Sequence, residues 1–69
     1  MQAYNLFRSK SDGVCCAVPE DHAIPSFLTS DLWEFSGKAG QQIGLPVGFN
    51  AAAAMTGVRF NGFYLFEIF

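Results

Sequence analysis

The residues best suited to chemistry lie close together in the chain. Cys15, Cys16, Glu20, Asp21 and His22 fall within eight positions of one another, and His22 is the chain's one histidine. Thiols, imidazoles and carboxylates bind zinc and transfer protons, so this cluster is the natural place to look for a site. Structural zinc sites, however, draw four ligands from spaced pairs such as Cys-x-x-Cys, and these two cysteines are adjacent. We therefore expect no metal site and no cofactor.

Cys16 and His22 are the pair that an enzyme could use. Nucleophilic catalysis by cysteine needs a thiolate in contact with an imidazole that a third group orients. The two residues flank a turn that contains Pro19, so contact is feasible, but the sequence indicates no third group. We expect a non-catalytic protein. The alternative is a small metal- or thiol-dependent enzyme, or a small-molecule binder, that uses Cys16 and His22.

The charge pattern argues against two other classes of protein. The net charge is −2 and the four basic residues are scattered, whereas a nucleic-acid binder usually carries a basic face. No apolar run approaches the roughly 20 residues of a membrane-spanning helix, and the N-terminus does not resemble a signal peptide. We therefore expect a cytoplasmic protein with no nucleic acid and no membrane among its partners, and a chain that is complete because it begins at Met1.

The sequence favours core positions for the cysteines rather than a disulfide. Adjacent side chains on a strand point to opposite faces, and a bond between them would strain the backbone. We expect two reduced thiols at Cys15 and Cys16, with at least one of them buried as a small apolar side chain.

The C-terminal stretch, residues 63–69, is the strongest strand signal in the chain. It is rich in aromatic and β-branched residues, and both of its faces are apolar except at Glu67. We expect Phe66 to lie in the core of a central strand, and one face of this strand to require cover from a second molecule. The candidate interface residues are Phe63, Tyr64, Leu65, Phe66, Ile68 and Phe69.

The composition also favours a partner. Only 14% of the residues are charged, whereas an ordinary globular domain has about 25%. So short a chain has a large surface for its volume, and few charges to cover it. We expect a protein-protein interaction module that forms a homo-oligomer, most simply a dimer, or that binds another protein. Two alternatives remain: a monomer with scattered apolar surface, and an adaptor whose acidic surface around Glu20, Asp21 and Asp31 meets a basic target.

These residues must be positioned by one small domain, residues 1–69, with an α+β fold. Asp12-Gly13 between two apolar runs predicts a β-hairpin, because glycine accepts positive φ without cost. Asn50 before four alanines predicts the start of a helix. The expected architecture is a small antiparallel β-sheet of three to five strands with one short helix packed on one face. The expected strands are 3–8, 14–18, 32–38 and 63–69, and the helix lies near 50–56.

The end of that helix is less clearly marked. Gly57 fits a left-handed helix terminus, which would leave Asn61-Gly62 as a hairpin turn. In the alternative, the helix continues through Gly57 to Asn61, and Gly62 ends it. An internal glycine costs about 1 kcal/mol relative to alanine, so both versions stay open.

Overall fold

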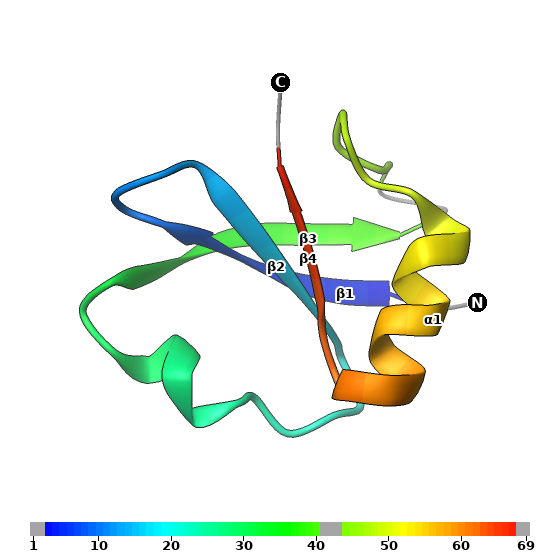
Figure 1. The fold of residues 1–69 in the computed structure, drawn as a ribbon, viewed down its shortest axis with the longest axis horizontal. Coiled ribbons are helices and arrows are strands. Elements are labelled where there is room, and N and C mark those ends of the chain that lie inside the picture. Colours follow the sequence, from blue (N-terminus) through cyan, green and yellow to red (C-terminus); the bar gives the residue numbers. More distant parts are fainter. Residues whose placement is uncertain (1–2, 41–43, 68–69) are drawn as a thin grey trace.

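The computed structural model describes residues 3–40 and 44–67. Over this part of the chain, four antiparallel strands form one sheet in the order β3-β1-β2-β4, and one α-helix packs on it (Figure 1). The expected α+β fold is therefore confirmed. The elements are β1 (Ala3–Ser9), β2 (Val14–Pro19), the 3-10 helix η1 (Ser26–Thr29), β3 (Trp33–Gly40), α1 (Ala51–Asn61) and β4 (Tyr64–Glu67).

The hairpin of β1 and β2 forms as expected. Gly13 has a φ of 74°, which an L side chain rarely adopts, and the Asp12 carboxylate accepts a hydrogen bond from the Val14 N–H at 3.2 Å. These two features build the tight turn that the Asp-Gly step predicts. The turn sets the register of the central pair of strands, in which Leu6 lies opposite Ala17.

One face of the sheet, called here the α1 face, is covered by the helix. Its small residues let the helix approach closely, since Ala17, Ala39 and Ala54 are all fully buried. Phe49, just before the helix, packs edge-on against three aromatic rings of this face and so holds the start of α1 down. The buried residues of the α1 face are Tyr4, Leu6, Cys15, Ala17, Ala39, Ala54 and Phe66.

The opposite face, called here the η1 face, has a smaller core under the 3-10 helix. Leu28 of η1 packs over Phe7, Cys16 and Val18, and Trp33 and Phe63 close the sides. Cys15 and Cys16 are both free and buried, on opposite faces of the sheet. The expectation of two free thiols with at least one of them in the core is confirmed, and both are in fact buried.

The helix is longer than its expected range. It begins after Asn50, whose side-chain oxygen accepts the Ala53 N–H at 2.9 Å, and it continues through Gly57. Gly62, with a φ of 86°, ends it and donates its N–H to the Val58 carbonyl at 2.9 Å. The prediction of a hairpin turn at Asn61-Gly62 is therefore wrong, and the alternative prediction, in which Gly62 ends the helix, is confirmed.

Gly57 has a different role from the one its sequence position suggests. A Cβ at this position would lie 3.1 Å from the Phe63 carbonyl oxygen and 3.4 Å from the Tyr64 ring. Glycine therefore lets the helix pass close to the chain entering β4, where a Cβ would require the Phe63 carbonyl to move by a few tenths of an ångström. Figure 1 shows the result, with α1 running beside the strand that follows it directly in the chain.

Candidate interaction surface

The C-terminal strand, the centre of the interface hypothesis, lies at an edge of the sheet. β4 pairs with β2 alone in the strand order β3-β1-β2-β4 of the described chain, so the expectation of a central strand is wrong. Phe66 is nevertheless a core residue, at 6% exposed, as expected. Its ring stacks on Tyr64 at 5.4 Å between centroids and meets Phe49 at 5.2 Å. The helix layer covers the α1 face of β4, while the η1 face of β4 carries the half-exposed Leu65 and the exposed Glu67.

The structure separates the candidate interface residues into two kinds. Tyr64 and Phe66 face α1, and Phe63 packs on the η1 face against Phe27 at 5.1 Å. Leu65 is 49% exposed, so it is the one of the four described candidates whose large apolar side chain remains half in solvent. Ile68 and Phe69 lie outside the described residues.

The backbone of β2 determines which groups of β4 face outward. The Glu20 N–H donates to the Ala3 carbonyl at 3.0 Å, which makes these two opposite residues a hydrogen-bonded pair. Hydrogen-bonded and non-hydrogen-bonded pairs alternate along an antiparallel ladder. Even-numbered residues of β2 therefore bond to β1. The odd-numbered ones, Cys15 and Ala17, direct their N–H and C=O groups towards β4.

The same alternation leaves one residue of β4 pointing outward at its centre. Phe66 lies opposite Cys15 and Tyr64 opposite Ala17, so these two β4 residues use their backbone groups on β2. Leu65, between them, turns its N–H and C=O to the edge. No backbone hydrogen bond to these groups exists within residues 3–40 and 44–67. Leu65 thus presents an unpaired donor, an unpaired acceptor and an apolar side chain at one point.

The backbone at the other edge, along β3, is hydrogen-bonded to neighbouring loops at its two ends. At its start the Trp33 N–H donates to the Ser30 carbonyl at 3.3 Å. At its end Gly40 and Gly44 exchange two hydrogen bonds, at 3.2 and 2.7 Å. Between them the pairing with β1 shifts by one residue, which leaves Ser36 as an extra residue in a β-bulge.

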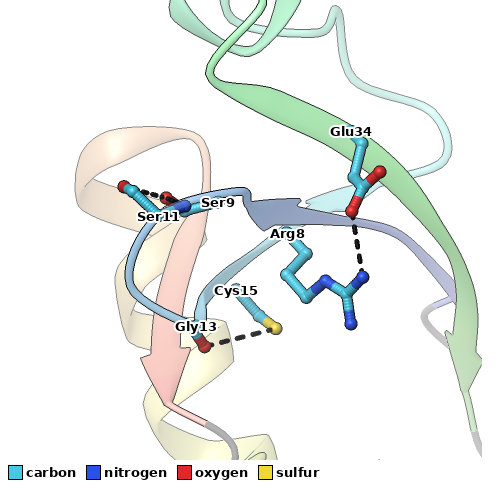
Figure 2. Close-up of polar contacts among 6 residues, drawn as sticks. All are labelled: Arg8, Ser9, Ser11, Gly13, Cys15 and Glu34. Carbon is cyan, nitrogen blue, oxygen red and sulfur yellow. Dashed lines mark hydrogen bonds and ion pairs between the residues drawn. The ribbon is translucent and has the colours of Figure 1, made fainter.

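Charged side chains also mark the β3 edge. Glu34 accepts a hydrogen bond from the Arg8 guanidinium at 2.9 Å across the β1–β3 pair (Figure 2). Lys38 pairs with Glu20 from the connection after β2. Bulges and charges are the devices by which natural sheets prevent unwanted strand pairing. The β3 edge has both devices.

An apolar row crosses the η1 face from one edge to the other. The two inner residues of the row are buried beneath the η1 region, while the two outer ones, on β3 and β4, are 59% and 49% exposed. Four cross-strand neighbours form this row: Phe35, Phe7, Cys16 and Leu65. The 3-10 helix is too short to cover the ends of the row.

An open depression of about 340 Å³, lined by Val14, Gly48 and the four residues of β4, runs along the β4 edge.

The structure places Cys16 in the core of the η1 face and His22 at the surface. Burial, together with the neighbouring Cys15, raises the pKa of the Cys16 thiol to about 12. The thiolate that catalysis requires is therefore scarce near neutral pH. His22 is exposed, and its Nδ1 lies 3.0 Å from the Asp21 carboxylate. Among residues 3–40 and 44–67, no group of three or more histidine, cysteine or acidic side chains is placed to hold a metal ion.

The acidic surface of the adaptor alternative is partly neutralised. Glu20 pairs with Lys38, and Asp21 with His22. Two of the three acidic residues thus already have basic or titratable partners within the chain. A basic target would have to displace these contacts.

No helix within the described ranges is long and apolar enough to cross a bilayer. The chain matches no protein family model, and comparison with curated proteins and with solved structures found no significant similarity.

Proposed function

We propose that this protein is a small non-catalytic interaction module that self-associates through the edge of β4. The observation that carries the proposal is Leu65, whose outward N–H and C=O have no hydrogen-bond partner within the described chain and whose side chain is half exposed. Extended segments bind such edges by strand addition, where main-chain hydrogen bonds give affinity and side chains give specificity.

The composition supports the same proposal. With 14% charged residues, the chain has few groups that keep an apolar surface soluble. The exposed outer residues of the apolar row, Phe35 and Leu65, flank a face that the short η1 helix covers only at its centre. A second polypeptide on β4 would remove the Leu65 side chain from water and would satisfy its backbone groups together.

The test is the solution mass by light scattering, from micromolar to millimolar concentration, for the wild type and Leu65→Pro. Proline is tolerated on an edge strand where the N–H faces solvent, so this change removes the outward donor and spares the ladder to β2. We expect association of the wild type, a monomeric Leu65→Pro, and similar circular dichroism for both. Leu65→Val is the matched control, since it keeps the donor and suits a strand.

Two results would overturn the proposal. One is a wild-type protein that stays monomeric at millimolar concentration. The other is a folded Leu65→Pro variant that associates as strongly as the wild type, because the contact would then lie elsewhere.

A further inference from the structure

We infer that two copies of the chain join by antiparallel pairing of their β4 edges, around a two-fold axis that passes through Leu65. The inference rests on the proposed function and adds to it the partner, the symmetry and the register. It is carried by the parity of the β4 ladder, by the position of Glu67 and by the contrast between the two sheet edges.

Symmetry restricts the register first. A two-fold axis that relates two antiparallel edge strands stands perpendicular to the sheet, so both α1 helices lie on the same side of the joined sheet. Directly opposite residues then come from the same face of each copy. Leu65 and Glu67 share the η1 face, while Tyr64 and Phe66 share the α1 face. Within β4, the axis can therefore pass through a residue but not between two residues. Of the four residues, the central ones, Leu65 and Phe66, are the positions that pair most of β4 with its copy.

Charge selects between these two registers. An axis through Phe66 places each Glu67 opposite an apolar Leu65, and brings the two Glu67 side chains into diagonal positions about 7–8 Å apart. An axis through Leu65 offsets the two Glu67 residues by four positions, or about 14 Å along the strands. Because the chain already carries a net charge of −2, the register that separates these carboxylates is favoured.

Side-chain packing agrees with the charge. With the axis at Leu65, the two half-exposed leucines lie opposite each other on the η1 face. Their outward N–H and C=O groups exchange a pair of hydrogen bonds. On the α1 face, Tyr64 of one copy lies opposite Phe66 of the other. The stack that these two rings form at 5.4 Å within one chain is thereby extended into an aromatic ladder.

The other edge explains why the assembly would stop at two copies. Joining two β4 edges produces an eight-stranded sheet whose outer strands are both β3. Those edges carry the bulge at Ser36, the occupied backbone at Gly40 and the ion pair at Glu34. Such edges resist further pairing, so the two-fold contact closes the assembly as a dimer rather than continuing it as a fibre.

The register can be tested by single-cysteine cross-linking with Leu65→Cys and Glu67→Cys. The native Cys15 and Cys16 are 2% and 0% exposed, so mild oxidation acts on the introduced thiols. Opposite residues of a hydrogen-bonded pair have Cα atoms about 5.5 Å apart, within the disulfide range of about 4.4–6.8 Å. We expect Leu65→Cys to become a covalent dimer and Glu67→Cys, its exposed neighbour on the same face, to remain uncrosslinked.

A mixture of the two variants supplies the decisive outcome. If the axis passes through Phe66 instead, the introduced thiol of a Leu65→Cys copy faces that of a Glu67→Cys copy. The mixture then yields a covalent heterodimer, while each variant alone yields no covalent dimer. That result would overturn the register and leave the proposed function intact. Light scattering in reducing buffer is recorded first, since a loss of association there, in the wild type as well, would instead overturn the proposed function.

Discussion

The two edge strands of this sheet, β3 and β4, are stabilised in different ways and differ in how they are protected from further strand pairing. β3 has a bulge, hydrogen-bonded ends and two ion pairs, while its Phe35 side chain is 59% exposed. β4 is regular over its described length, and its Phe66 side chain is buried against the helix layer. The β3 edge is thus protected by backbone and charge, and the β4 edge is anchored by apolar packing.

The differences between the two edges indicate which edge is expected to bind a partner. An edge that carries a bulge and charged side chains is one on which additional strands are disfavoured. The β4 edge has no bulge in the described chain and carries one charged side chain, Glu67, while Leu65 turns a donor, an acceptor and a half-exposed side chain outward. The β3 edge is therefore expected to remain in contact with solvent, and the β4 edge is the candidate interface.

The strongest test of this comparison is truncation of one phenylalanine on each edge. Phe66→Ala should lower the free energy of unfolding by about 3–5 kcal/mol, because it empties a packed site beneath the helix. Phe35→Ala removes mainly its edge-on contact with Phe7, at 5.7 Å, and should cost at most about 1.5 kcal/mol. Chemical denaturation at equal protein concentration measures both. A loss within about 0.5 kcal/mol for Phe66→Ala would mean that β4 is not anchored by the core.

The contact of the helix with β4 offers a second test. Gly57→Val places a branched side chain against the Phe63 carbonyl and should destabilise the fold by about 1–3 kcal/mol. Ala52→Val, on the exposed side of the same helix, changes only helix propensity and should cost below about 0.7 kcal/mol. Thermal or chemical denaturation of the pair separates the two causes. Because valine is a better helix former than glycine, a Gly57→Val variant as stable as the wild type would show that α1 does not press on β4 at Gly57.

Local patterns in the sequence predict much of this fold, because they depend on neighbouring residues. The period of two places Tyr64 and Phe66 on one face and Phe63 on the other. The Asp-Gly step and the Asn50 cap act within a few residues of themselves. Each of these predictions is confirmed, although element ends differ by a few residues.

Features that depend on distant parts of the chain could not be read from the sequence. A strand with apolar residues on both faces suggests a central position, but β4 lies at the edge, with α1 over one face and Leu65 half exposed on the other. Gly57 resembles a terminator, and only its distance to Phe63 reveals a packing role. The exposure of Leu65, and hence the candidate contact, depends on how far the short η1 helix extends over its face.

The cysteines behind β4 give a third prediction, on pH. Burial raises the pKa of Cys16 to about 12 in the folded protein, above the unfolded value of about 8.5. Above a pH of about 8.5 the Cys16 thiol loses its proton in the unfolded chain but keeps it in the folded protein, so the free energy of unfolding falls as the pH rises. Below that pH the thiol is protonated in both states, and its contribution does not change with pH. Between about pH 8.5 and 9.5 the loss should be about 1 kcal/mol, measured by denaturant titration.

The control for this pH dependence is Cys16→Ala. The variant should be less sensitive to pH over the same interval, and the slope that remains reports on Cys15, whose pKa burial also raises. If the free energy of unfolding of the wild type did not change over that interval, water would reach Cys16 in the folded state. Water would then also reach the pairing of β2 with β4, on which the β4 edge depends.

The smallest effect belongs to the β3 edge. Glu34→Gln breaks the ion pair with Arg8, in which both side chains are about half exposed. Exposed pairs of this kind contribute about 0.2–1 kcal/mol and are screened by salt. The variant should therefore differ slightly from the wild type at low ionic strength and match it in about 1 M salt. Because the bulge at Ser36 remains, light scattering should show no new association through β3. A loss of several kcal/mol, insensitive to salt, would mean that β3 is anchored as firmly as β4, and the contrast between the two edges would then not identify the interface.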